Sequence, residues 1–108
     1  MLYEMRIYTA APGKLPALHE RFRRHTLRFF ERHGIRSVGY WTSVIGPNNN
    51  QLIYILAWET LAEREERWDK FAADPEWLKA KEESEVDGPL VTSFSNMIMA
   101  PTDYSPMG

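Results

Sequence analysis

The sequence predicts one α+β domain in which helices cover one face of an antiparallel sheet. Its 108 residues fall below the roughly 150 of a typical domain, so a two-domain protein is excluded. Four stretches have the alternation, or the β-branched and aromatic content, of strands, and two stretches between them space their apolar residues as helices do. A hydrophobic content of 44% is enough to build a core, which excludes a disordered chain.

The first strand is expected at residues 2–9. Alternation divides its side chains between two faces: Tyr3, Met5 and Ile7 on one, and Leu2, Glu4, Arg6 and Tyr8 on the other. Pro12 and Gly13 then favour a turn, which ends this strand.

A helix is expected from Pro16 to about His33, because proline fits the first helical turn and Gly34 stands where a left-handed cap belongs. Its apolar face has steps of three or four residues and comprises Leu15, Leu18, Phe22 and Phe29. A basic stripe of Arg21, Arg24, Arg28 and Arg32 lies on the other side. We interpret this stripe as a solvated face.

A long hairpin is expected next, with strands at residues 35–45 and 51–59 joined by the turn at residues 46–50. The second of these strands is apolar on both faces. Helices can cover only one of them, so in so short a chain a second copy of the protein is expected to cover the other.

The remaining elements are a helical region and a last strand. Thr60 and Glu63 match a capping box, Asp74 and Pro75 start a second, shorter helix, and residues 90–100 alternate as a strand. The order of strand, helix, two strands, helices and strand is the ferredoxin-like pattern.

Composition excludes several functions. The chain has no cysteine, so disulfides, thiolate metal sites and thiol nucleophiles are excluded. Residues 1–36 carry eight basic and three acidic side chains, whereas residues 59–87 carry five and eleven. This contrast suggests neighbouring helices with complementary faces, and a polyanion site is the alternative. No leader or membrane-spanning segment is visible, so we expect a cytoplasmic protein.

Several motifs along nearly the whole chain resemble the NIPSNAP family. They are Tyr3–Thr9 with Pro12–Lys14, Gly39–Trp41, Ile45–Gly46, Trp58–Glu59, Leu61–Arg64 and Asp74–Trp77, and the tail Pro101–Pro106 resembles the end of single-domain bacterial members. The resemblance implies a dimeric α+β barrel with a domain at residues 1–100 and a tail at residues 101–108. It also implies a ligand pocket between sheet and helices in each subunit. The wider superfamily contains small monooxygenases and haem-handling enzymes, but a fold alone confers no activity.

Two residues are candidates for catalysis. His25 falls about 50° from the centre of the apolar helix face, so its ring is expected to meet the sheet edge. There it is a general base, a haem ligand or simply a histidine satisfied by a hydrogen bond beside the core. Arg6 shares a strand face with Glu4. It either binds a carboxylate or enolate oxygen or pairs with Glu4 to lock the barrel interior or the dimer interface.

Four aromatic residues of the central hairpin are candidates for ligand binding: Tyr40, Trp41, Tyr54 and Trp58. Core packing is the alternative explanation for them. No spacing typical of a metal site, a phosphate loop or an RNA-binding strand is present, so we expect no metal, no cofactor, no nucleic acid and no membrane as partners.

Two functions remain open. The first is a homodimer, or a higher oligomer, that binds a small apolar molecule or serves a structural role. The second is a cofactor-independent monooxygenase or a haem-handling enzyme in which His25 or Arg6 handles a proton or an oxyanion.

Overall fold

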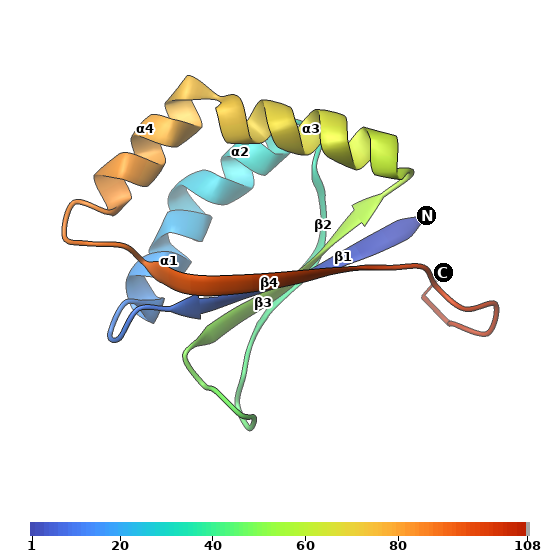
Figure 1. The fold of residues 1–108 in the computed structure, drawn as a ribbon, viewed down its shortest axis with the longest axis horizontal. Helices are drawn as coiled ribbons and strands as arrows, with labels where there is room; N and C mark the ends of the chain where they lie inside the picture. Colours follow the sequence, from blue (N-terminus) through green and yellow to red (C-terminus); the bar gives the residue numbers. More distant parts are fainter. Residues whose placement is uncertain (108) are drawn as a thin grey trace.

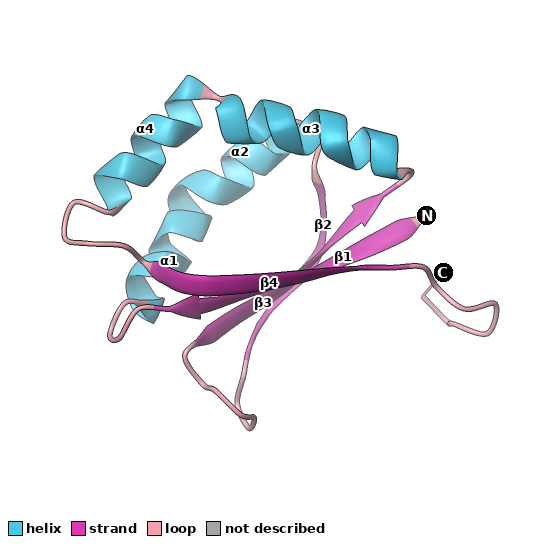
Figure 2. Ribbon diagram, viewed as in Figure 1, coloured by secondary structure: helices cyan, strands magenta, loops and turns pink. Residues whose placement is uncertain are grey.

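The computed structural model describes residues 1–107 and contains four antiparallel strands, with all helices on one side of the sheet (Figures 1 and 2). The elements are β1 (Leu2–Ala10), α1 (Leu15–Arg21), η1 (Phe22–Thr26), α2 (Leu27–Arg32), β2 (Arg36–Thr42), β3 (Gln51–Trp58), α3 (Leu61–Ala73), α4 (Pro75–Ser84) and β4 (Val91–Met99). The strand order β2-β3-β1-β4 confirms the predicted ferredoxin-like fold. The first of the hairpin strands is shorter than expected, because it ends at Thr42 and leaves Val44 and Ile45 exposed in the loop.

The two faces of the sheet differ in what covers them. In the β1–β3 register Glu4 pairs with Leu56 and Arg6 pairs with Tyr54, and all four are buried beneath the helices. The opposite face carries a row in which Met5 lies between Ile55 on β3 and Met97 on β4. This outer face is apolar around Met5 and Ile7 and polar at the end where Thr9 pairs with Ser93, and none of the helices lies on it (Figure 1).

The expected long helix is interrupted by the π-helical segment η1. The Leu27 amide donates to the Phe22 carbonyl five residues earlier, and the Thr26 hydroxyl donates to the Arg21 carbonyl at 3.4 Å. Buried side chains recur here every four residues, at Leu18, Phe22, Thr26 and Phe30. A regular α-helix would rotate such a row by about 40° per step, so a wider turn is needed to keep the row facing the sheet.

This wider turn corrects one prediction. Arg21, which we assigned to the solvated basic stripe, is buried, whereas Arg24, Arg28 and Arg32 are exposed as expected. The phase of a regular helix does not describe the residues on both sides of a π segment.

The helix ends follow the sequence signals. The Thr60 hydroxyl accepts from the Glu63 amide at 3.1 Å, the Asp74 carboxylate accepts from the Glu76 amide at 2.9 Å, and Gly34 has a φ of 70°. These bonds satisfy amides that a helix leaves free at its start. No helix within residues 1–107 is long and apolar enough to cross a bilayer.

The opposite charges of the two helical regions meet as predicted. Arg32 donates to Asp74 and to Glu76, both at 3.1 Å. His33 Nε2 lies 2.7 Å from Asp74 Oδ2. The complementary faces therefore join the end of α2 to the start of α4.

Candidate functional site

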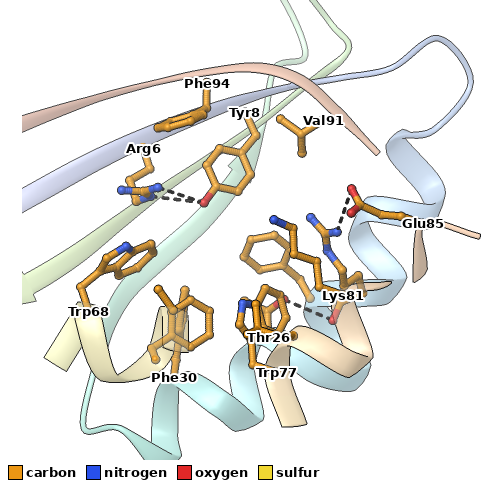
Figure 3. Close-up of a pocket in the computed structure, with 15 residues that line it drawn as sticks. Arg6, Tyr8, Thr26, Phe30, Trp68, Trp77, Lys81, Glu85, Val91 and Phe94 are labelled. Atoms are coloured by element: carbon orange, nitrogen blue, oxygen red, sulfur yellow. Dashed lines mark hydrogen bonds and ion pairs between the residues drawn. The ribbon is translucent and has the colours of Figure 1, made fainter. Parts of the chain in front are cut away.

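A cavity of about 380 Å³ lies between the sheet and the helices (Figure 3). Its size is at the small end of the roughly 300–1,000 Å³ typical of ligand sites. Seven of the fifteen residues that line it are aromatic: Tyr8, Phe22, Phe30, Trp68, Phe71, Trp77 and Phe94. Polar groups of the wall include Arg6, Arg21, Thr26, Lys81 and Glu85. The wall therefore combines aromatic surface with four charged side chains.

The aromatic wall is held by contacts among the rings themselves. The Phe71 ring centroid lies 5.0 Å from that of Phe30 and 4.9 Å from that of Trp77. Tyr8 packs edge-on against Phe94, with ring centroids 6.0 Å apart. Such pairs stabilise beyond the area they bury. Because the rings come from β1, β4 and four helical segments, the folded chain builds the cavity before any ligand binds.

Behind the wall, the Glu4 carboxylate is fully buried and accepts five hydrogen bonds. The donors are Arg6 Nη1 at 2.9 Å, Trp58 Nε1 at 3.1 Å, Arg64 Nε at 2.8 Å, Arg64 Nη2 at 3.0 Å and Asn96 Nδ2 at 2.9 Å. Burial on its own would raise the pKa of Glu4, but these donors outweigh it and lower the pKa to about 2. Glu4 is therefore an anion that its neighbours fully satisfy.

Arg6 links this carboxylate to the cavity. Besides the bond to Glu4, Arg6 Nε donates to the Tyr54 hydroxyl at 2.9 Å, and Arg6 Nη2 donates to the Tyr8 hydroxyl at 3.2 Å. The guanidinium also lies 4.3 Å from the Trp68 ring centroid, on the ring face. Burial, aided by Tyr8, raises the pKa of Tyr54 well above its usual value, although Arg6 acts in the opposite direction. Tyr54 is thus neutral and donates to the Tyr8 hydroxyl at 2.7 Å.

A second buried arginine stands elsewhere in the wall. Arg21 Nη1 lies 3.7 Å from Glu85 Oε2 and donates to the Ser84 hydroxyl at 3.3 Å. Burial lowers the pKa of Arg21 below its ordinary value, and the charge of Glu85 offsets this only in part. The wall also holds Lys81 (Figure 3). We call Arg21, Lys81 and Glu85 the charged end of the cavity.

The structure separates the two candidate catalytic residues. Arg6 lines the cavity and pairs with buried Glu4. Pairing with Glu4 was one of the two alternatives for Arg6. His25 lies in shallow depressions between η1 and α4, beside Ala80 and Glu83, with Nδ1 3.4 Å from Arg28 Nη2. It is outside the cavity wall and not at the sheet edge where we expected its ring, because η1 changes the helix phase in this region.

The four hairpin aromatics lie outside the cavity wall too. Tyr54 and Trp58 are buried behind it, and Tyr40 stacks on Tyr54 with centroids 5.3 Å apart. Trp41 pairs with Ile53 on the outer face. Its ring covers Gly39, where a Cβ atom would come within 2.7 Å of the indole. Ligand contact by these four residues remains a prediction that the position of the cavity does not support.

The aromatic residues that do line the cavity come mainly from the helices. Trp68, Phe71 and Trp77 were visible in the sequence as apolar helix positions, and Phe94 as an alternating strand position. Nothing in their spacing distinguishes a cavity wall from a core. Arg21 gave a misleading signal, since its spacing from other arginines placed it on a solvated face.

The residues of the cavity do not fit a haem. None of the three histidines lies in the wall, and within residues 1–107 no cysteine or methionine does. Tyr8 lies in the wall, but its hydroxyl accepts from Arg6 and Tyr54. No group of three metal-ligating side chains occurs in the part of the chain that the structure describes. We therefore derive no chemistry through a metal or haem.

Together these features define a ferredoxin-like α+β domain with an aromatic cavity between its sheet and its helices. The chain belongs to the NIPSNAP family, whose model matches residues 3–106. Two crystal structures of NIPSNAP family proteins from Agrobacterium tumefaciens are similar over nearly the whole length. One, of unknown function, is 33% identical with a TM-score of 0.87, covering 100% of this chain and 94% of the other. The second is 30% identical with a TM-score of 0.87, covering 99% and 98%.

A more distant structure shares the fold alone. A candidate antibiotic biosynthesis monooxygenase from Nitrosomonas europaea is 12% identical with a TM-score of 0.64, covering 94% of this chain and 98% of that one. No curated protein matches this chain. The family and the fold are thus established by the comparisons, and function has to be argued from the cavity.

Proposed function

We propose that this protein binds a small, largely apolar molecule in the cavity between sheet and helices. The observation that carries the proposal is the aromatic wall, to which six elements contribute seven side chains around a cavity of about 380 Å³. Filling such a space would bury apolar ligand surface, and each Å² removed from water stabilises by about 25 cal/mol. The charged groups of the wall would fix the orientation of the ligand.

Binding of N-phenyl-1-naphthylamine, whose fluorescence rises in apolar surroundings, tests the proposal. Ala72 lines the cavity and its neighbour Ala73 does not, although both are exposed on α3. We expect Ala72→Trp to weaken binding at least tenfold by filling the space, and Ala73→Trp to leave binding unchanged. No binding by the unaltered protein, or equal effects of both substitutions, would overturn the proposal.

A second candidate is the oxygenation of a phenolic or quinol-type substrate without a cofactor. One observation favours it: the Tyr8 hydroxyl belongs to the wall and accepts from Arg6 and Tyr54, so its own proton could be donated to a developing oxyanion. The likeness to the Nitrosomonas europaea protein supports only the fold. Oxygen uptake with a panel of quinols tests this candidate. We expect Tyr8→Phe and Arg6→Ala to slow it at least roughly tenfold, and uptake slowed by His25→Ala alone would contradict the assignment.

We also propose that the outer face of the sheet packs against a second copy of the chain. Large apolar side chains remain open there, with Trp41 49% and Met97 54% exposed. Contiguous apolar surface of this kind is unusual on monomers and is typical of interfaces.

A further inference from the structure

Two arginines are buried within residues 1–107, and their surroundings differ sharply. Arg6 donates four hydrogen bonds, one of them to the buried carboxylate of Glu4. Arg21 donates one, at 3.3 Å to a serine hydroxyl, and its nearest carboxylate oxygen is 3.7 Å away. Arg21 Nε is fully buried and donates to no atom of the described residues. Both side chains line the same cavity.

The surroundings of Arg21 are unfavourable for a charged group. A guanidinium has five N–H donors and no acceptor, so burial removes water from donors that need replacement acceptors. The Arg21 side chain is only 5% exposed. The side chain of its partner Glu85 is 28% exposed, so the carboxylate is partly hydrated. At 3.7 Å from Arg21 Nη1, this carboxylate is also beyond ordinary hydrogen-bond distance. Arg21 therefore reduces the stability of the protein unless another acceptor reaches it.

The fold holds Arg21 in this position through the π segment that follows it. The Arg21 carbonyl accepts from the Thr26 hydroxyl across the widened turn, and Thr26 lines the cavity beside Phe22. π segments inside helices are frequent at functional sites. The geometry thus places a charged, poorly satisfied side chain among aromatic rings.

We propose that the ligand of the cavity is a small aromatic monocarboxylate, whose carboxylate binds Arg21 and whose ring lies among the aromatic side chains of the wall. This inference rests on the proposed binding function and names its ligand class. A planar carboxylate matches the two-pronged geometry of a guanidinium. The wall carries three cationic side chains, Arg6, Arg21 and Lys81, against one acidic, Glu85.

The charge of the wall also favours one negative charge over two. Arg6 is already paired with Glu4, so the cations available to a ligand are Arg21 and Lys81. Glu85 lies 3.7 Å from Arg21 and would repel a doubly charged phosphate more strongly than a carboxylate. A single carboxylate therefore fits this site best.

Titration calorimetry with 2-naphthoate and its neutral analogue 2-naphthamide tests the inference. The two probes have the same ring and nearly the same shape, so a difference in affinity measures recognition of the charge. We expect the unaltered protein to bind 2-naphthoate at least tenfold more tightly. In Arg21→Met the two affinities become equal, while Arg24→Met, on the exposed side of the same helix, keeps the preference.

Thermal unfolding without ligand gives a second, independent readout. Because Arg21 is poorly satisfied, Arg21→Met should unfold at the same or a higher temperature, yet 2-naphthoate should no longer stabilise it. A residue with a purely structural role would lower the unfolding temperature when replaced. A large fall in that temperature, or failure of Arg21→Met to fold, would overturn the inference.

The outcomes separate this inference from the function on which it rests. Equal binding of the two probes by the unaltered protein, or a preference that survives Arg21→Met, overturns the carboxylate assignment and leaves a cavity that binds apolar molecules. Binding of neither probe overturns the carboxylate assignment, and the absence of N-phenyl-1-naphthylamine binding as well would overturn both proposals.

Discussion

The Glu4 carboxylate joins three strands and one helix. It accepts from Arg6 on β1, Trp58 on β3, Arg64 on α3 and Asn96 on β4. Removing either the carboxylate or one of its charged donors would leave the other charge buried without a counter-ion, which is costly. The inner face of the sheet is therefore held by one ionic centre within an otherwise aromatic core.

Replacing Glu4 should destabilise the protein strongly. In Glu4→Gln the two guanidinium groups of Arg6 and Arg64 lose their shared negative charge, and we expect the free energy of unfolding to fall by about 3–5 kcal/mol. Urea unfolding followed by circular dichroism measures this. The matched control is Glu59→Gln, which breaks the exposed pair with Arg36 at 2.9 Å and should cost about 1 kcal/mol or less. Similar losses in both variants would contradict the account of Glu4.

The lowered pKa of Glu4 also predicts a pH dependence. The pKa lies at about 2, below the ordinary value of 4.5, so the unfolded chain takes up this proton first as the pH falls. The stabilisation is thus complete above about pH 5 and is lost as the pH falls toward 2. The stability difference between the unaltered protein and Glu4→Gln should shrink over that range. Asp74, whose pKa His33 helps to lower to about 2, contributes equally to both proteins, so a constant difference would contradict the prediction.

Among the elements, η1 decides which side chains reach the cavity. Leu18 and Phe30 are both buried although twelve residues separate them. In a regular α-helix, twelve residues correspond to about 120° beyond three full turns, which would turn one of the two away from the sheet. The π turn contains one residue more than a regular turn, so Leu18 and Phe30 stay on the same side. The added residue lies between Arg21 and Thr26, whose side chains are both buried.

Deleting Arg24 should remove the π turn and keep the fold. Eleven residues then separate Leu18 from Phe30, about 20° from three full turns of a regular α-helix, so both remain in the core. We expect a cooperative unfolding transition but at least tenfold weaker binding of N-phenyl-1-naphthylamine. Deletion of exposed Asn49 in the β2–β3 loop is the control and should leave binding unchanged. Full binding after loss of Arg24 would show that the π turn does not shape the cavity.

This element marks the limit of what the sequence could predict. The order of the strands and helices and the caps at Thr60 and Asp74 follow from local signals, and the structure confirms them. The pairing of Glu4 with Arg6 was one of two alternatives that the sequence left open. The position of Arg21 depends on one extra residue in a helix whose ends are fixed by packing. The helical aromatics of the wall, such as Trp68, depend on which core positions leave space between them, and apolar periodicity carries no information about that.

The molecule as a whole is thinner than its length would suggest. Its principal extents are 46, 36 and 19 Å, and its Cα radius of gyration is 14.5 Å, compared with about 13 Å for a compact domain of this size. The short dimension runs across the four strands, and the view along it shows the sheet with helices on one side and none on the other (Figure 1). On the outer face, Met5, Ile7, Ile53 and Ile55 are half-buried.

Such a face predicts a symmetric dimer in solution. Two copies related by a twofold axis would cover the same apolar face on each other, with a core between two sheets. Small-angle scattering at micromolar concentration should therefore give twice the mass of the chain and a radius of gyration above 14.5 Å. Met97→Glu places a charge on this face and should yield monomers, whereas Val86→Glu, at a position 81% exposed beyond α4, should leave the dimer intact. If the unaltered protein were monomeric, Trp41 and Met97 would remain exposed to water without a partner. That result would contradict the predicted dimer.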